Sequence, residues 1–328
     1  MSSTDPIRRW PNRLAVALAL ATFPLIWMGG LVTTYGAGMA VPDWPQTYGY
    51  WFYYPLRSWL ATRDIFLEHS HRMIGTVVGL LTIALAWALW RRDRRRWVRW
   101  WGLVALAGVC AQGLLGGLRV RMNEIVLADI HGCFAPLFFA LTTALVAITS
   151  AAWQSPVPAR PHPAARGLQR LSLALTVLAY LQIVFGAQLR HIARLTAASS
   201  LSLWVWLHVL NALLIAGILV WLICVVRRHA KSERPLAWRT TLLGLVFVVQ
   251  SALGIATWVV KYGWPGWFTT YVWSLEYTVV SGARLPSHLT TAHVACGSLL
   301  LVTSLSLTLW TRRLLAADAS MAATEPPP

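Results

Sequence analysis

The stretch that decides the fold is Ser-Leu-Trp-Val-Trp-Leu-His-Val-Leu-Asn-Ala-Leu-Leu-Ile-Ala-Gly-Ile-Leu-Val-Trp-Leu-Ile-Cys-Val-Val, residues 202–226. It contains no charged residue, and Arg227 and Arg228 follow it directly. About 20 apolar residues cross the hydrocarbon core of a bilayer as one helix, because each helical residue rises about 1.5 Å. Similar blocks recur along the chain, so we expect an all-α membrane protein with eight transmembrane helices, at about residues 14–36, 65–90, 97–118, 125–150, 168–189, 202–226, 240–260 and 287–311.

The composition agrees with a membrane protein and argues against a nucleic-acid-binding one. Hydrophobic residues make up 57% of the chain and charged residues only 12%, whereas a soluble protein has about 25% charged residues. The net charge is +17, but the positive residues lie in the connections between apolar blocks and form no basic stripe. We therefore expect membrane lipid headgroups as the anionic partner and no nucleic acid.

The distribution of Lys and Arg predicts the topology. If the N-terminus is inside, the inner segments hold nineteen of the 28 Lys and Arg residues and the outer connections hold eight, with Arg72 inside a span. Cytoplasmic loops carry the excess of positive charge, so both termini are expected in the cytoplasm. The two long outer connections, residues 37–64 and 261–286, are rich in Trp, Tyr and Pro and should lie against the membrane surface.

An internal repeat divides the chain into two similar halves. Three outgoing helices carry the motif Gln-x-x-x-Gly, as Gln112 with Gly116, Gln182 with Gly186 and Gln250 with Gly254. The first helix carries Gly29-Gly30 at the equivalent outer end. Small residues let neighbouring helices approach closely. We expect two pseudo-symmetric four-helix bundles, at residues 1–155 and 156–315, followed by a disordered Ala- and Pro-rich tail at 316–328.

Four histidines are the main candidates for chemistry: His71, His131, His208 and His293. Each falls near the start of an incoming helix, so all four are expected at similar depth toward the outer face, two per bundle. Ionisable groups inside spans usually mark a function, and two facing histidines in a four-helix bundle are a usual axial pair for heme iron. The alternative is that each histidine only hydrogen-bonds a neighbouring helix.

Glu68 distinguishes the first half from the second. Glu68 and His71 stand three residues apart and share a helix face, and Arg72 could pair with Glu68 or with a heme propionate. The matching position before His208 is Val205. An acid beside a heme ligand can relay protons or position a water molecule; the alternative is an interfacial Glu–Arg pair.

Other candidates carry less weight. His69 should point away from the expected heme, and His288 lies off the helix face of His293. An ordinary surface role is expected for His191, with a role facing a heme propionate as the alternative. The cysteines form no CxxC pair and are expected to be buried thiols; they are Cys110, Cys133, Cys224 and Cys296.

Several motifs resemble the heme A synthase family. They are Gly-Gly-Leu-Val-Thr at 29–33, Gly-Ala-Gly-Met-Ala-Val-Pro-Asp-Trp-Pro at 36–45 and Glu-His-Ser-His-Arg at 68–72, together with the histidines of the fourth, sixth and eighth spans. The resemblance covers nearly all eight spans. It implies an oxidoreductase of the bacterial inner membrane that oxidises the C8 methyl group of heme O to the formyl group of heme A for terminal oxidases.

The resemblance also assigns roles to the candidate residues. His71 and His131 would bind the substrate heme, with Glu68 near its reacting edge, while His208 and His293 would bind a resident heme b that passes electrons. Heme O synthase, cytochrome c oxidase assembly and an unidentified electron partner are implied as well. Some family members carry a cysteine pair in the first outer loop, which this chain lacks, so no thiol-dependent step is expected. The competing hypothesis is a diheme cytochrome b that transfers electrons without catalysis.

Overall fold

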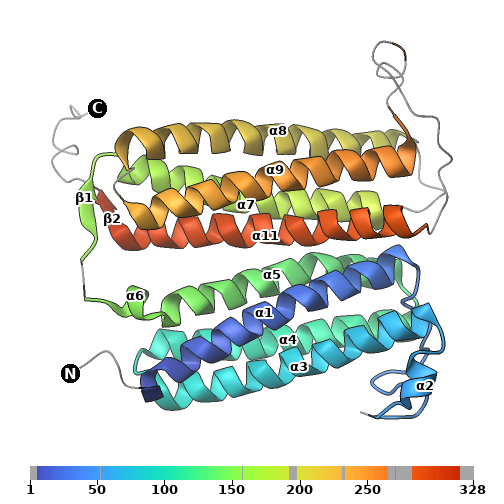
Figure 1. Cartoon of the computed structure of the whole chain (residues 1–328). Coiled ribbons are helices and arrows are strands. Elements are labelled where there is room, and N and C mark those ends of the chain that lie inside the picture. The colour runs from blue at the N-terminus through green and yellow to red at the C-terminus, as the bar shows by residue number, and fades with distance from the viewer. Residues whose placement is uncertain are drawn as a thin grey trace.

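Eight long helices form the body of the part of the protein that the structure describes (Figure 1). The computed structural model describes residues 6–51, 53–156, 158–191, 198–230, 233–264, 270 and 283–317. The long helices are α1 (Pro6–Thr34), α3 (Arg63–Arg92), α4 (Arg96–Met122), α5 (Ile125–Thr149), α7 (Ala165–His191), α8 (Ala198–His229), α9 (Arg234–Tyr262) and α11 (Arg284–Leu314). All eight are long and apolar enough to cross a membrane. The predicted eight spans are confirmed, and the chain is a multi-pass membrane protein.

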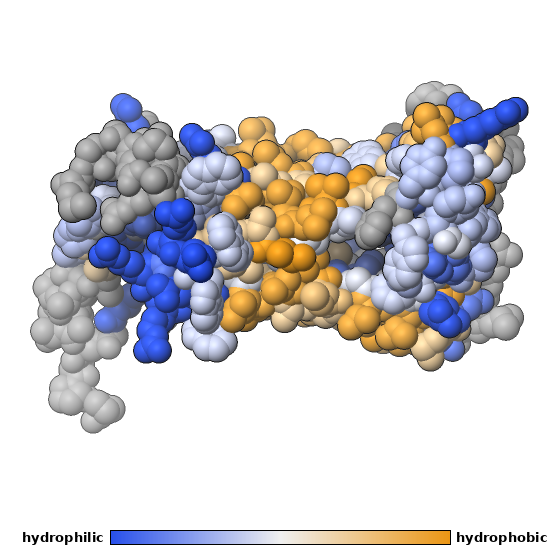
Figure 2. Space-filling model, turned by 90° about the horizontal axis from the view of Figure 1, so that it is seen from below, coloured by the Kyte–Doolittle hydropathy of each residue, from blue (hydrophilic) through white to orange (hydrophobic). Residues whose placement is uncertain are grey.

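The helices extend past the apolar blocks into polar sequence. Figure 2 shows the result as a hydrophobic band around the middle, with hydrophilic residues gathered at both ends. Basic residues occupy the last turns of α3, α8 and α11, among them Arg92, Arg228 and Arg313. Cations there interact favourably with the negative end of the helix dipole. Thr62 caps the other end of α3, since its side chain accepts a hydrogen bond from the backbone N–H of Ile65.

Four helices pack in each half of the chain. Contacts link α1 with α3, α3 with α4, α4 with α5 and α5 with α1, and a second closed set links α7, α8, α9 and α11 (Figure 1). Helix α11 also contacts α1 and α5, and α5 contacts α7. The start of α1 and the end of α11 lie at the same end of the molecule (Figure 1).

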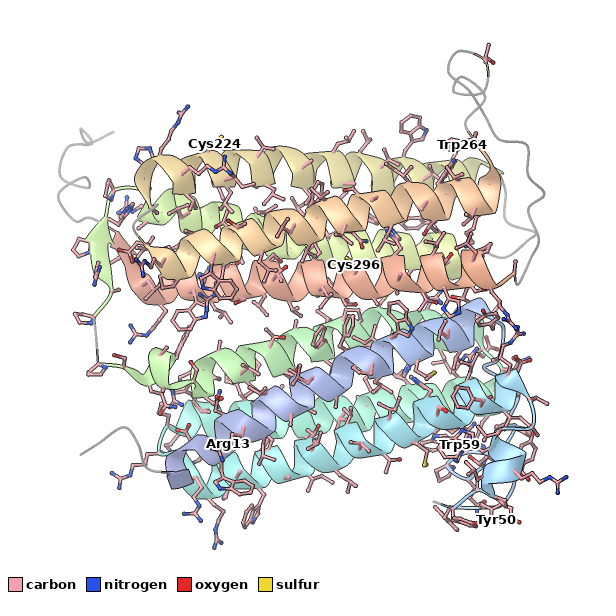
Figure 3. All side chains as sticks on the ribbon, in the orientation of Figure 1. Arg13, Tyr50, Trp59, Cys224, Trp264 and Cys296 are labelled. Carbon is pink, nitrogen blue, oxygen red and sulfur yellow. The ribbon has the colours of Figure 1, made fainter. Side chains whose placement is uncertain are left out.

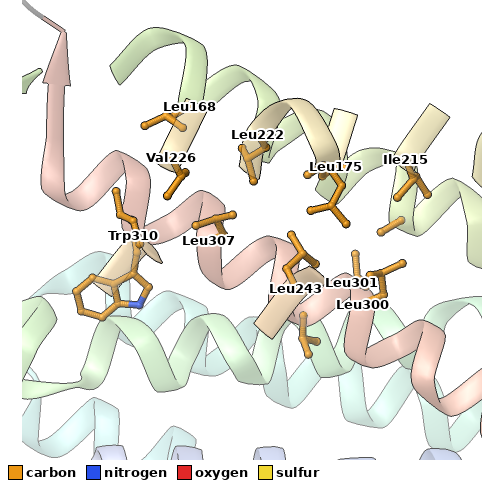
Figure 4. Close-up of a cluster of buried hydrophobic side chains, with 14 of the residues drawn as sticks. Leu168, Leu175, Ile215, Leu222, Val226, Leu243, Leu300, Leu301, Leu307 and Trp310 are labelled. Atoms are coloured by element: carbon orange, nitrogen blue, oxygen red, sulfur yellow. The ribbon is translucent and has the colours of Figure 1, made fainter. Parts of the chain in front are cut away.

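The core of the second half is mostly leucine. Figure 4 shows these side chains meeting between the helices, and Leu168, Leu222 and Leu307 are fully buried. Hydroxyl pairs add polar contacts: Ser172 lies 3.2 Å from Thr311, and Thr176 lies 2.9 Å from Thr308, oxygen to oxygen. Such interhelical hydrogen bonds contribute to helix association inside a membrane.

Short elements complete the fold and correct one prediction. They are α2 (Leu56–Trp59), α6 (Ala151–Gln154), β1 (Arg160–His162) and β2 (Leu315–Ala317). The two strands pair in parallel, with Arg160 opposite Leu315. Ala316 and Ala317 therefore belong to a strand, not to the predicted disordered tail, because their backbone finds a partner in β1; residues 318–328 lie outside the described residues.

The cysteines and the long outer connections differ partly from expectation. All four cysteines are free, and Cys296 is buried as expected, but Cys110 and Cys224 are exposed on the helix surface. Figure 3 places Cys224 and Cys296 on different helices. An apolar thiol on a helix that faces lipid needs no burial in protein. Residues 35–51 and 53–62 form the described part of the first outer connection, with Tyr50 and Trp59 at one end of the molecule (Figure 3); most of 261–286 lies outside the described residues.

Candidate functional site

The four predicted histidines come together as two facing pairs. His71 on α3 faces His131 on α5, with ring centres 6.4 Å apart and ring planes at 80°. His208 on α8 faces His293 on α11, with ring centres 6.2 Å apart and planes at 66°. The two members of each pair come from non-consecutive incoming helices of the same half.

This spacing fits one metal ion between the two rings of each pair. A bond from a histidine nitrogen to a metal is about 2 Å long, and the ring centre lies about 1 Å behind that nitrogen. Two imidazoles that bind one ion from opposite sides therefore have centres roughly 6 Å apart. Both pairs have this separation. Edge-to-face aromatic rings adopt separations of about 4.5–7 Å as well, so the choice of a metal rests on the donor atoms of the rings together with this spacing.

Each histidine ring lies against a glycine of the helix that precedes it. A Cβ atom added to Gly29 would lie 2.9 Å from Cε1 of His71, and one added to Gly254 would lie 2.9 Å from Cε1 of His293. The same distance is 3.2 Å from Gly116 to His131 and from Gly186 to His208. These are the glycines of the sequence repeat. The absence of a side chain at each one creates the space that an imidazole fills.

All four rings also have the same orientation. Cε1 and Nδ1 lie nearest to the glycine and Nε2 lies farther away. Nδ1 of His293 lies 3.2 Å from the carbonyl oxygen of Gln250, which can only accept, so Nδ1 carries the proton and Nε2 keeps its lone pair for a metal. No hydrogen bond within the described part of the chain engages Nε2 of any of the four, and their donor set suits heme iron.

The glutamines of the repeat hold the histidine-bearing helices in place. Nε2 of Gln112 donates to the carbonyl oxygen of His131 at 3.3 Å, and Nε2 of Gln182 donates to that of His208 at 3.0 Å. Gln182 also accepts from Asn211 at 2.6 Å through Oε1. In the motifs of Gln112 and Gln182, the glutamine side chain thus binds the histidine's backbone and the glycine one turn later leaves space for its ring. In the third motif it is the backbone oxygen of Gln250 that contacts the ring of His293.

Glu68 is part of a buried ion pair that anchors the first outer loop. Its side chain is almost fully buried, and Oε1 accepts from Nη2 of Arg72 at 2.6 Å while Oε2 accepts from the backbone N–H of Val41 at 2.9 Å. Arg72 also donates to the carbonyl oxygens of Val41, Asp43 and Gln46, at 2.9, 2.7 and 2.6 Å. The two partners expected for Arg72 were Glu68 and a heme propionate, and in the structure Arg72 pairs with Glu68. Both carboxylate oxygens of Glu68 are engaged by the loop and Arg72.

Asp43 stabilises the same loop from within. Its two carboxylate oxygens accept from the backbone N–H groups of Tyr48 and Gly49, each at 2.8 Å. Partial burial alone would raise the pKa of Asp43, but these backbone hydrogen bonds and the positive charge of Arg72 outweigh it and lower that pKa below its ordinary value. The Pro-Asp-Trp-Pro motif at 42–45 is thus fixed from two sides, by Asp43 inside the loop and by Arg72 on α3.

His69 and His288 contact residues other than the paired histidines. His69 is buried, with Nδ1 3.0 Å from the hydroxyl of Thr47 and its ring between Tyr54 and Trp59, so it supports the loop. His288 packs edge-on against Tyr35. The helix α7 ends at His191, whose side chain lies outside the described residues.

The sequence did not single out two arginines near the C-terminal ends of α4 and α7. Nη1 of Arg119 on α4 donates to the carbonyl oxygen of Gly38 at 2.9 Å. Nη2 of Arg190 on α7 donates to the carbonyl oxygen of Gly30 at 2.6 Å and to the hydroxyl of Thr34 at 2.8 Å. Their position, three or four residues after the glycines of the repeat, was a usable signal.

Comparison with known proteins identifies the family of the chain. Residues 12–265 match the COX15-CtaA family, described as "Cytochrome oxidase assembly protein", and this match covers well over half of the chain. The chain belongs to this family. The resemblance seen in the motifs of the sequence is thereby confirmed.

Two of the similar proteins are heme A synthases and a third is a protoheme IX farnesyltransferase. The heme A synthase of Shouchella clausii is 26% identical over 266 residues, which cover 75% of this chain and 85% of that protein. The heme A synthase of Exiguobacterium sibiricum is 25% identical over 280 residues, covering 80% and 88%. A protoheme IX farnesyltransferase of Halobacterium salinarum is 28% identical over 148 residues, 42% of this chain and 31% of that protein.

Proposed function

We infer that the protein is a heme A synthase, an oxidoreductase that converts the C8 methyl group of heme O into the formyl group of heme A. The observation that carries this inference is the pair of metal-spaced histidines in each half of a chain that belongs to the COX15-CtaA family. The conversion amounts to two successive two-electron oxidations at one methyl carbon. Relatives that match most of this chain are named heme A synthases.

We propose that His71 and His131 bind the substrate heme. The support is an asymmetry: the buried pair of Glu68 and Arg72, and the loop that it anchors, belong to the half that contains these two histidines. A loop fixed over one end of a site excludes water and restricts how a substrate enters. We propose Glu68 as a positioning residue of this reaction, since its contacts hold Arg72 and the backbone of Val41.

His208 and His293 are proposed to bind heme b, which when bound passes electrons to or from the substrate site. The chain's own contribution is to orient the two rings through Gly186, Gly254 and the Gln250 carbonyl. The two halves are proposed to be pseudo-symmetric units, at 1–155 and 156–315. The support is the recurrence of one glycine-to-histidine contact in all four places.

The topology and the partners are part of the same proposal. We place the protein in the bacterial inner membrane with both termini cytoplasmic and both heme sites toward the outer face, supported by the bias of Lys and Arg. Heme O synthase, which would supply the substrate, and the assembly of cytochrome c oxidase are the proposed functional partners, together with an unidentified electron partner. The similarity to a protoheme IX farnesyltransferase supports the link to heme O synthesis.

One experiment separates the enzyme from its main alternative. The full-length protein is co-expressed with a heme O producer, and the extracted pigments are separated by chromatography. Heme A in the extract supports the proposed function. Heme b on the protein, with heme O left unconverted, would favour a diheme cytochrome b, an alternative kept because both histidine pairs have nearly the same geometry.

A further inference from the structure

Two cations lie outward of the His208–His293 pair, and neither pairs with a carboxylate among the residues that the structure describes. Arg190 stands on α7, which supplies the glycine against His208, and Lys261 stands on α9, which supplies the glycine against His293. The charge of Arg190 acts on the ammonium group of Lys261. Neither residue takes part in an ion pair within the described parts of the chain. Two like charges near the end of a membrane helix repel one another unless an anion lies nearby.

The helical periodicity directs both cations toward the same space. Arg190 follows Gly186 by four residues, and Lys261 follows Gly254 by seven, so each lies within about 40° of its glycine around the helix. They lie about 6 and 10 Å farther outward at a rise of 1.5 Å per residue. The glycines face the histidine rings. The two cations therefore lie on the faces that border the histidine pair, one to two turns nearer the membrane surface.

Arg190 has N–H groups that donate to no acceptor among the described residues. Its Nη2 atom uses both protons, on the carbonyl oxygen of Gly30 and the hydroxyl of Thr34. Nη1 and Nε have no acceptor among the described residues. The fixed Nη2 leaves the remaining N–H groups of a rigid, planar guanidinium directed away from α1. A carboxylate is the ligand that such a fork binds most strongly.

The first half is arranged differently at the corresponding place. Arg119 follows Gly116 by three residues, and the carboxylate of Glu68 lies close enough to act on its charge. Arg119 also donates to the Gly38 carbonyl oxygen. The positive charge of Arg119 is therefore partly balanced by Glu68, whereas no carboxylate in the described part of the second half balances Arg190 and Lys261.

We propose that Arg190 and Lys261 bind the propionate carboxylates of a heme held by His208 and His293. This inference rests on the heme b site of the proposed function and adds the groups that orient that heme. Paired this way, the propionates lie toward the outer surface and the ring lies deeper between the histidines. The two cations also hold the heme at a more positive electrostatic potential, which favours the reduced iron.

The test compares two porphyrins that differ only in these carboxylates. Full-length protein made without heme is titrated with iron protoporphyrin IX and with its dimethyl ester, and binding is followed by the low-spin absorption band. We expect the wild type to bind the free acid more tightly by roughly tenfold or more, the effect of one charge-assisted hydrogen bond. Arg190→Gln and Lys261→Gln should each reduce this preference, and the double variant should abolish it.

A second measurement and one control variant distinguish a propionate contact from a general loss of charge. The midpoint potential of the low-spin heme should fall in both single variants. Arg121→Gln removes an exposed charge from the outer end of α4 and should leave preference and potential unchanged. Lys261→Gln breaks no hydrogen bond of the described residues, so it remains informative if Arg190→Gln fails to accumulate. Equal binding of the two porphyrins by the wild type would overturn the inference, even in a preparation that synthesises heme A.

Discussion

The contact between Gly254 and His293 provides the sharpest quantitative test of the heme site. Replacing Gly254 by alanine places a methyl group 2.9 Å from Cε1 of His293, whereas carbon atoms in favourable contact lie about 3.5–4.0 Å apart. The imidazole must move by about 0.6–1 Å or tilt. Because its Nδ1 hydrogen bond to the Gln250 carbonyl oxygen is already 3.2 Å long, that movement also weakens the bond that fixes the tautomer.

The size of the effect follows from the cost of overpacking. Inserting a methyl group into a well-packed site costs about 1–3 kcal/mol, and each 1.4 kcal/mol is a factor of about ten in affinity. Heme affinity at this pair should therefore fall by roughly 5- to 150-fold in Gly254→Ala. Gly186→Ala, where the contact is 3.2 Å, should produce the smaller loss.

The assay is the heme content of the purified protein together with its reduced-minus-oxidised spectrum. Gly244→Ala is the matched control on the same helix, because its Cβ atom would meet Ile223 at an ordinary 3.7 Å. Alanine generally stabilises a helix relative to glycine by about 0.5–1 kcal/mol, so general destabilisation does not explain a selective loss of heme. Full heme occupancy with an unchanged spectrum in Gly254→Ala would refute the reasoning.

Three other changes test separate parts of the site. His208→Ala, like His293→Ala, should remove the low-spin heme b spectrum by leaving the iron one axial ligand; an unchanged spectrum would reassign heme b to the other pair. Glu68→Gln should retain heme b but lower heme A formation by roughly tenfold or more, because breaking a buried ion pair typically costs about 3–5 kcal/mol; full activity would end the positioning role. The pKa of Asp43 is lowered in the fold, so its stabilisation of the loop is complete above the ordinary carboxyl pKa of about 4 and is lost as the pH falls through the folded value. Limited proteolysis at decreasing pH should show the loop opening in the wild type, and Asp43→Asn should remove that pH dependence. Identical cleavage profiles of the two proteins against pH would contradict this role of Asp43.

The sequence predicted the helices well because one requirement governs them, an apolar segment long enough to cross the bilayer. A block such as 202–226 is too apolar and too long for any other element, and α8 contains all of it. The ends of the helices were less predictable. Helix α11 starts at Arg284, not near 287, because a helix can continue past the hydrocarbon core wherever its backbone hydrogen bonds continue to form. The pairing of β1 with β2 was missed because Arg160-Pro-His and Leu315-Ala-Ala show no alternating pattern.

The candidate site was predictable in its residue types but not in most of its contacts. Counting from the helix starts gave the four histidines, and the repeat gave the glycines that contact them. Glu68 was predicted as a partner of Arg72, but its other three partners could not be, because they are carbonyl oxygens of a loop whose path depends on tertiary structure. Cys110 and Cys224 were expected inside because a sequence does not say which side of an apolar helix faces lipid.

Two consecutive glycines on α1 have a consequence for communication between the halves. Gly29 faces His71, while a Cβ atom at Gly30 would lie 2.8 Å from Thr291, two residues before His293. The same turn of α1 thus touches the histidine helix of each site, and the Gly30 carbonyl oxygen is held by Arg190. Helix α1 therefore separates the two histidine-bearing helices at Gly29 and Gly30, where it has no side chains. The thickness of its backbone there would set the distance that an electron travels between the two sites.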